Sequence, residues 1–333
     1  MMSASGRPER RYPNRREFIA LGVGALLVAS LPAGLRRRRR LVRRSVPVMG
    51  TIADIAVVHR DPRYAQAAID TAIAELRFVD RTMSRFSSSS DVGRANLEAA
   101  AGPVTVAPET ALVVEEALRW AEGSGGSFDP CLGRVLALWD VGGRRVPPPA
   151  DQVVRFAGRG LYQFMELGSR AGEPVVLFRD ADVAIDLGGI AKGYGVDRAV
   201  EALRSYGIYN GLVNCGGDLY ALGHSEDGDP WSVGIRDPED PDRLIETIEA
   251  SDCAVATSGD YLQYFQYGGR RYHHMLDPTT GEPKRSRMRS LTVMAESCMA
   301  ADAAGTAVFG MPAGEAAHLL GVCDPGVRVV HSA

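Results

Sequence analysis

The hydrophobic periodicity of this 333-residue chain changes repeatedly between that of strands and that of helices, without a strict alternation. Apolar residues recur every three or four positions over residues 65–79 and predict an amphipathic helix that ends at Met83. Further helices are predicted from Pro108, from Asp151 and after Gly189. Runs of β-branched and apolar residues predict strands at residues 51–58, 183–187, 211–214, 231–235, 254–257 and 291–295. No internal repeat or long linker divides these elements, so we predict one α+β domain of mixed sheets with packed helices.

The first 44 residues differ from the rest of the chain. They contain 12 Arg and only two acidic residues. Arg15 and Arg16 precede an uncharged apolar run at residues 18–35, an order that is typical of a twin-arginine export signal. We therefore predict a leader at residues 1–44 and a folded domain at residues 45–333. The expected location is outside the cytoplasm, in the periplasm or on the extracytoplasmic face of the membrane.

The fate of this leader is open between three alternatives. The apolar run of 18 residues is barely long enough to span a bilayer, and basic residues flank it on both sides. Cleavage near residues 29–33, retention as an uncleaved anchor and a disordered basic tail all agree with that pattern. No Cys follows the run, so a lipoprotein anchor is not supported.

The charge of the remaining residues argues against one class of partner. The whole chain has 38 basic and 41 acidic residues, and removing the 12 and two of the leader leaves 26 and 39, a net charge of −13. Nucleic-acid binding requires a basic surface, so we expect no nucleic-acid partner. The five Cys are far apart without a C-x-x-C motif, which leaves no readable zinc site or disulfide framework.

A glycine-rich turn at residues 186–193 follows one predicted strand and leads into a helix. Backbone N–H groups in such a turn can face an anion, although neither a Walker A nor a G-x-G-x-x-G pattern is present. Lys192 lies in this turn and is one of only two Lys in the chain. Its compact ammonium suits contact with phosphate or adenine. The alternative is a tight turn with a purely structural role.

Asp302 and Thr306 are four residues apart in an Ala- and Gly-rich helical segment. On a helix this spacing places the carboxylate and the hydroxyl on one face, where both could bind a hard cation such as Mg²⁺. The alternative is a packed Ala-rich helix with a solvated Asp.

Four more clusters combine glycine or proline turns with polar side chains. His274 precedes an Asp-Pro-x-Thr-Gly turn and could act as a general base or cap that turn. Asp129 follows a glycine run at residues 123–126 and could accept a hydrogen bond from a ligand. The others lie at residues 214–218 and 256–260. Together the six clusters suggest a phosphate-rich ligand held with a metal.

The order of these clusters resembles that of the ApbE family of FAD:protein FMN transferases. Eight blocks carry the resemblance, at residues 49–51, 83–86, 128–130, 186–193, 213–218, 256–261, 274–281 and 301–307. The resemblance covers about residues 46–311 and implies a T-fold-like α+β domain, FAD as substrate, Mg²⁺ and an exported protein.

The resemblance also implies roles for single residues. FAD contacts are implied at Met49, Phe86, Ser127, Phe128, Asp129, Asp186, Lys192 and Leu276. The implied metal ligands are the side chains of Asp302 and Thr306 and the backbone carbonyl of Gly189. His274 and Asp302 are the implied catalytic residues. Phe86 stands where the family commonly has Tyr or Trp.

The activity implied by the resemblance is phosphoryl transfer. A Thr or Ser hydroxyl of an acceptor flavoprotein attacks the phosphorus on the FMN side of FAD, and AMP leaves. The implied acceptors carry an FMN-binding segment, such as subunits of sodium-pumping quinone reductase and Rnf-type complexes. One alternative is an FAD pyrophosphatase that gives free FMN and AMP. The other is a non-catalytic flavin-binding protein, which need not keep Asp302 and Thr306.

Overall fold

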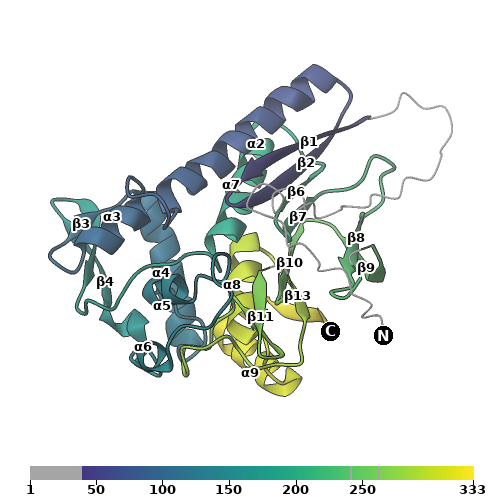
Figure 1. The fold of residues 1–333 in the computed structure, drawn as a ribbon. Helices are drawn as coiled ribbons and strands as arrows, with labels where there is room; N and C mark the ends of the chain where they lie inside the picture. Colours follow the sequence, from purple (N-terminus) through teal and green to yellow (C-terminus); the bar gives the residue numbers. More distant parts are fainter. Residues whose placement is uncertain (1–39, 241, 262) are drawn as a thin grey trace, which may run out of the picture.

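The computed structural model describes residues 40–240, 242–261 and 263–333 (Figure 1). Its centre is a seven-stranded antiparallel sheet with the strand order β1-β2-β6-β7-β10-β13-β14. The strands are β1 (Arg40–Val48), β2 (Thr51–His59), β6 (Gly211–Cys215), β7 (Asp218–Leu222), β10 (Cys253–Gly259), β13 (Ser290–Ala295) and β14 (Arg328–Ser332). The strands predicted for β2, β6, β10 and β13 are confirmed to within two residues at each end.

Strand β1 begins inside the segment that we predicted to be the leader. Arg40 pairs with His59 of β2, and the pairing continues to the end of both strands. The folded part therefore begins before residue 45, and the predicted boundary needs correction. Two of the basic residues of the predicted leader form ion pairs with the domain: Arg43 lies 3.5 Å from Asp54, and Arg44 pairs with Asp70. Residues 1–39, with the predicted export signal, lie outside the described residues.

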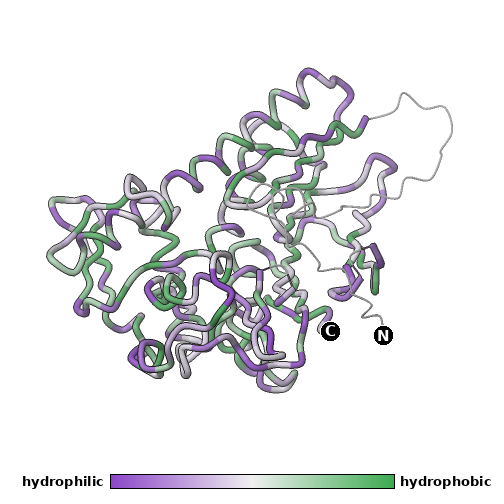
Figure 2. The backbone as a smooth tube through the Cα atoms, in the orientation of Figure 1, coloured by the Kyte–Doolittle hydropathy of each residue, from purple (hydrophilic) through white to green (hydrophobic). Residues whose placement is uncertain are grey.

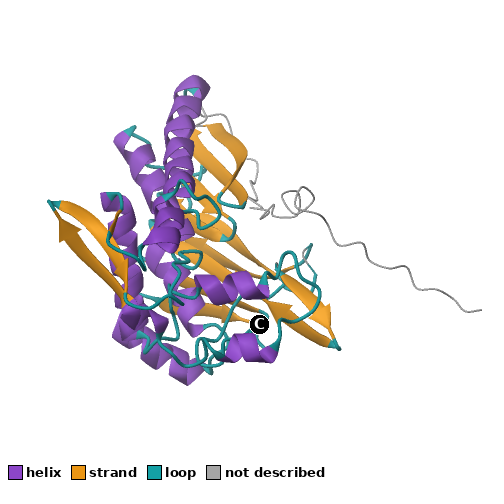
Figure 3. Cartoon of the chain, turned by 60° about the vertical axis from the view of Figure 1, so that its left-hand side comes forward, coloured by secondary structure: helices purple, strands orange, loops and turns teal. Residues whose placement is uncertain are grey.

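Three helices cover one face of the central sheet (Figure 3). They are α2 (Pro62–Met83), α7 (Ala191–Ser205) and α8 (Cys298–Val308). Helix α2 begins where the Asp61 carboxylate accepts hydrogen bonds from the N–H groups of Arg63 and Tyr64. Its apolar stripe is buried as predicted, and the helix ends at Met83.

A two-stranded hairpin covers part of the opposite face of the sheet. It consists of β8 (Trp231–Arg236) and β9 (Leu244–Ala250). Trp231 is fully buried in the apolar cluster between hairpin and sheet, and its indole N–H donates to the Leu222 carbonyl at 3.0 Å. Apolar residues accordingly run along the strands of the central sheet (Figure 2). The inner strands β6, β7 and β13 are therefore buried on both faces, whereas the edge strands β1 and β14 are partly exposed.

The remaining elements extend the helical side of the domain and share its core. A small sheet has the order β3-β5-β4, and β11 pairs with β12. The elements are α3 (Asp91–Glu98), β3 (Val104–Thr105), α4 (Pro108–Gly123), α5 (Gly133–Trp139), α6 (Ala150–Val154), η1 (Leu161–Phe164), β4 (Met165–Arg170), β5 (Glu173–Phe178), β11 (Tyr264–Tyr267), β12 (Arg270–His273) and α9 (Ala313–Cys323).

The predicted strand at residues 183–187 is wrong. Only Ala184 forms a bridge there, with Leu132. The segment is apolar because it is buried. At Ile185, however, the backbone pairs with a side chain and not with a neighbouring strand. The Ile185 N–H donates to Asn96 Oδ1 at 2.6 Å, and Asn96 Nδ2 donates to the Ile185 carbonyl at 2.9 Å. A buried extended segment and a strand have the same hydrophobic pattern.

The mixture of antiparallel sheets and packed helices confirms the predicted α+β class. Among the described residues, no helix combines the length and the apolar character needed to cross a bilayer.

Candidate functional site

The side chain of Lys192 lies between two buried carboxylates at the start of α7. Its Nζ is 2.9 Å from Asp218 Oδ2 and 3.0 Å from each carboxylate oxygen of Asp302. It also donates to the Gly188 carbonyl at 3.0 Å. The side chains of Asp218 and Asp302 are only 4% and 5% exposed. The cluster therefore brings together α7 and the turn before it, β7 with Asp218, and α8 with Asp302, which lie far apart in the sequence.

This cluster carries an excess of negative charge when both carboxylates are ionised. Burial and the nearby charge of Asp302 raise the pKa of Asp218 to about 7. Burial alone would lower the pKa of Lys192, but Asp218 and Asp302 together raise it above its ordinary value. The ammonium therefore stays charged, and the two carboxylates can still accept a further cation.

Gly189 and Thr306 lie next to each other beside this cluster. A Cβ added at Gly189 would be 2.7 Å from Thr306 Oγ1, so only glycine fits there. Asp302 and Thr306 occupy successive turns of α8, as predicted.

The oxygen atoms near Lys192 fit the ligand chemistry of a hard cation. The carboxylates of Asp218 and Asp302 already enclose a positive charge there, and the Gly188 carbonyl lies 3.0 Å from Lys192 Nζ. The Thr306 hydroxyl lies against Gly189 in the neighbouring turn and adds a further oxygen of the kind that such cations prefer. In the described part of the chain, His, Cys, Asp and Glu side chains form no group of three suited to a metal. Any cation here would therefore depend on hydroxyl and carbonyl oxygens as well.

Asp186 is held by a residue that was not predicted. Arg85 Nε lies 2.5 Å from Asp186 Oδ2, and the Gly188 N–H donates to Asp186 Oδ1 at 2.7 Å. The Arg85 guanidinium also lies 4.2 Å from the centre of the Phe86 ring. Phe86 is 76% exposed, which leaves its ring accessible to a planar ligand.

His274 follows directly after β12. Its backbone N–H donates to the Gln263 carbonyl at 3.3 Å, and its imidazole ring is partly buried. Burial, followed by the neighbouring His273, lowers the pKa of His274 to about 4. Lys192 and Asp186 also act electrostatically on this ring, which relates His274 to the cluster. The imidazole is therefore neutral at physiological pH.

The loop at residues 127–130 is joined to Asp186, whose N–H donates to the Pro130 carbonyl at 2.8 Å. Burial raises the pKa of Asp129 to about 6. Its carboxylate accepts hydrogen bonds from the Cys131 and Tyr162 N–H groups. The Ser127 hydroxyl is buried without a hydrogen-bond partner among the described residues. An orphaned hydroxyl of this kind is suited to a ligand contact.

The other three predicted FAD contacts differ in their exposure. Met49 has φ +53° in the two-residue turn between β1 and β2, and its side chain approaches Gly195 of α7. A left-handed Met is a strained choice for such a turn. Phe128 and Leu276 are 3% and 7% exposed and belong to the main core. A ligand would therefore meet mostly the backbone at these two positions.

Two residues that form ion pairs with predicted site residues were not identified from the sequence: Asp218 pairs with Lys192, and Arg85 pairs with Asp186. Asp218 belongs to the turn at residues 214–218, but the sequence does not indicate that it faces Lys192. Arg85 lies inside the block at residues 83–86. The ion pairs that join them to the site connect residues more than 20 positions apart, so only the fold reveals them.

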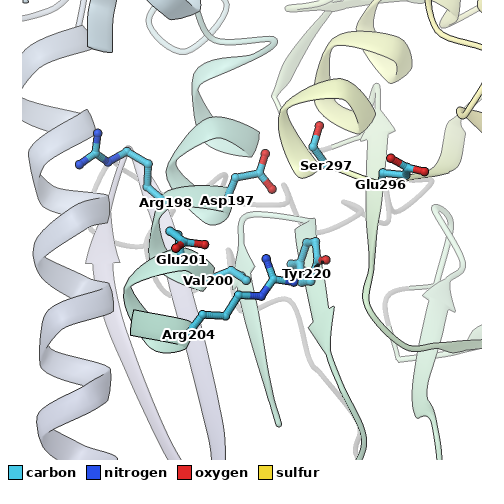
Figure 4. A pocket seen from close by; sticks show the side chains of 8 residues that line it. All are labelled: Asp197, Arg198, Val200, Glu201, Arg204, Tyr220, Glu296 and Ser297. Atoms are coloured by element: carbon cyan, nitrogen blue, oxygen red, sulfur yellow. Dashed lines mark hydrogen bonds between the residues drawn. The ribbon is translucent and has the colours of Figure 1, made fainter. Parts of the chain in front are cut away.

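A cavity of about 370 Å³ lies on another side of α7 (Figure 4). Its lining includes Asp197, Arg204, Tyr220 and Glu296, but none of the predicted site residues. Asp197 relates it to the site, because its two carboxylate oxygens accept hydrogen bonds from the N–H groups of Cys298 at 2.7 Å and Met299 at 2.8 Å. Asp197 therefore caps the helix that carries Asp302.

Changing Asp197 to Ala should destabilise the fold by about 1–3 kcal/mol, because two N–H groups at the start of α8 lose their acceptor. Urea unfolding measures the loss. Asp197→Asn retains one acceptor oxygen, so its free energy of unfolding should lie between those of Asp197→Ala and the wild type. Equal stability of all three proteins would show that α8 does not depend on this cap.

Known proteins match both the sequence and the fold. The ApbE family pattern matches residues 49–330. A Vibrio cholerae protein named FAD:protein FMN transferase is 35% identical over 296 residues, which cover 86% of each chain. A Treponema pallidum protein of the same name is 33% identical over 307 residues, 87% of this chain and 82% of the relative.

Two solved structures have the same fold. The ApbE protein of Thermotoga maritima has a TM-score of 0.76 and 31% identity, and the match covers 87% of this chain and 94% of that one. Flavin transferase ApbE from Vibrio cholerae has a TM-score of 0.73 and 30% identity, with 89% and 97% covered.

These matches define the class of the protein, which is an enzyme of the flavin-transferase type. More narrowly, the chain belongs to the ApbE family. The resemblance seen in the sequence is thereby confirmed, and so is the ApbE-type α+β fold.

Proposed function

We propose that this protein transfers the FMN part of FAD to a Thr or Ser hydroxyl of an acceptor flavoprotein and releases AMP. The observation that carries the proposal is the cluster of Lys192, Asp218 and Asp302 beside Gly189 and Thr306. It combines one retained positive charge with oxygen ligands that could hold a cation. A pyrophosphate needs both in so acidic a domain, since residues 40–333 have 29 basic and 39 acidic residues, a net charge of −10.

The start of α7 is suited to the pyrophosphate. A helix of 15 residues begins at Ala191, directly after the turn that contains Gly188 and Gly189. The positive end of its dipole and the Lys192 ammonium both favour an anion there. Mg²⁺ bound by Asp302, Thr306 and the Gly189 carbonyl would supply further positive charge to offset the charge that develops on the phosphate oxygens.

The reaction forms one bond and breaks another at the same phosphorus. The acceptor hydroxyl oxygen bonds to the phosphorus on the FMN side, and the bond from that phosphorus to the bridging oxygen breaks. The bridging oxygen leaves with AMP, and the hydroxyl proton must be accepted by a base. His274 is neutral at physiological pH and can accept it, so we assign it that role.

Changing His274 to Ala should slow transfer about 100-fold or more while FAD still binds, because the base is lost but the Lys192 cluster remains. Single-turnover rates and FAD titration separate the two effects. Changing His318, which lies on α9, to Ala provides a control with the same chemical deletion. Loss of FAD binding in His274→Ala would make His274 a structural residue instead.

The nearest alternative is an FAD pyrophosphatase, in which water replaces the acceptor hydroxyl. Incubation with FAD, Mg²⁺ and a candidate acceptor separates the two activities: transfer adds the mass of FMN to the acceptor, whereas hydrolysis gives free FMN and AMP. A pure flavin-binding protein would give neither product. The presence of both Asp302 and Thr306 on one face of α8 favours an enzyme.

We further propose that the enzyme acts outside the cytoplasm. The support is the pair Arg15 and Arg16 before the apolar run at residues 18–35. Exported redox proteins with an FMN-binding segment, such as quinone-reductase or Rnf-type subunits, are the proposed acceptors. Intact mass of such a subunit co-expressed with and without this protein tests both statements.

A further inference from the structure

One segment has a net charge opposite in sign to that of the domain as a whole. Residues 270–289 contain six basic residues and two acidic ones, a net charge of +4. Residues 45–333 as a whole carry −13. The segment includes β12, His274 and the loop that leads to β13. Basic residues are therefore concentrated around the proposed base of an otherwise acidic protein.

This segment is tied to the site by direct contacts. The Lys284 N–H donates to the Met275 carbonyl at 2.9 Å, and Leu276 bridges to Pro283. Lys284 Nζ donates to the Thr306 carbonyl at 3.1 Å. Arg287 is three residues further along, so its Cα lies within about 11 Å of that of Lys284.

Three arginines of the segment are only partly neutralised by the domain, and we call Arg270, Arg285 and Arg287 the basic rim. Arg270 and Arg285 share a single carboxylate, that of Glu282, at 3.4 and 2.9 Å. Arg287 is exposed and has no ion pair or hydrogen bond with any residue that the structure describes. By contrast, Arg271 and Arg289 both contact buried Asp260. The basic rim thus keeps an excess of two positive charges.

We propose that the basic rim binds an acidic segment of the acceptor protein next to its Thr or Ser. This inference rests on the proposed transfer of FMN. An acidic partner would be repelled by most of this domain, and the rim offers it one attractive surface on the segment that carries His274. Surface charges of this kind mainly steer association and orientation. FAD has a separate source of positive charge in Lys192.

The test compares two double variants that change the net charge equally. In Arg285→Glu/Arg287→Glu, the KM for a Rnf-type FMN-binding domain should rise about tenfold at low salt, and the difference should shrink at about 0.5 M NaCl. The kcat and the Kd for FAD should not change. The control is Arg60→Glu/Arg63→Glu, whose exposed side chains lie at the start of α2; the 22 residues of this helix span about 33 Å, and Arg85 lies just beyond its other end.

Three results would overturn the inference. An equal rise of KM in the control would assign the effect to net charge. A weaker Kd for FAD in the rim variant would assign the arginines to FAD. Loss of binding to vesicles of anionic phospholipid, with an unchanged KM for the soluble acceptor, would assign them to a membrane surface. Absence of FMN transfer by the wild type would instead contradict the proposed function itself.

Discussion

Asp302→Asn is expected to abolish FMN transfer, with a loss of about 10³-fold or more in kcat even at saturating Mg²⁺. The carboxylate accepts from Lys192 Nζ and from the Gly193 N–H, and it is the charged member of the proposed cation ligands. Asparagine keeps the shape and one acceptor but removes the charge. The mass gain of an acceptor domain after incubation with FAD measures the loss.

A pair of variants at Thr306 provides the control for this result. Thr306→Ser keeps the hydroxyl and should remain active, whereas Thr306→Val removes it at nearly constant volume and should lose most of the activity. Thermal unfolding checks that all three proteins are folded. Normal product from Asp302→Asn at saturating Mg²⁺ would contradict the assignment of Asp302 as a metal ligand.

Lys192→Met is expected to have the largest effect on stability, a loss of about 3–5 kcal/mol at pH 8, because it leaves Asp218 and Asp302 buried together without a cation. The loss should depend on pH. Asp218 has a raised pKa in the folded state, so the folded protein binds a proton more tightly than the unfolded chain. Stability therefore falls as pH rises from about 4 through 7. Removing the ammonium should steepen that fall.

Urea unfolding at pH 5 and pH 8 measures this difference. Lys192→Arg keeps the charge in a wider group and serves as the control, which should lose less stability at pH 8 than Lys192→Met. Added Mg²⁺ should stabilise Lys192→Met more than the wild type, because a cation can replace the missing charge. Equal stability of Lys192→Met and wild type at both pH values would mean that the ammonium does not compensate the two carboxylates.

Local patterns predicted much of the helical layer. The apolar stripe of α2 and the Asp61-Pro62 start are properties of neighbouring residues, so the sequence alone indicates them. The same is true of Asp302 and Thr306, because two residues that are four positions apart on a helix lie on the same face. Their position beside Lys192 depends on the packing of α7 against α8, which no local pattern contains.

Two errors have the same physical origin. Residues 183–187 are apolar like a strand, but the backbone of Ile185 bonds the Asn96 side chain and that of Ala184 and Asp186 bonds the loop at residues 130–133. Arg43 is basic like a leader residue, but it lies 3.5 Å from Asp54 of β2. In both cases the deciding partner, Asn96 or Asp54, lies outside the local stretch on which the prediction was based. Asp218 and Arg85 were missed as site residues for that reason as well.

The contacts of Lys192 and Lys284 have a practical consequence for chemical labelling. These are the only two lysines in the chain, and both contact α8: one at Asp302, the other at the carbonyl of Thr306. Burial lowers the pKa of Lys284 to about 8, which favours the reactive neutral amine. Apart from the α-amino group of the chain, an acylating reagent can react only at these two lysines, so coupling at a lysine modifies a group that contacts α8. Immobilisation or fluorophores should therefore use another chemistry.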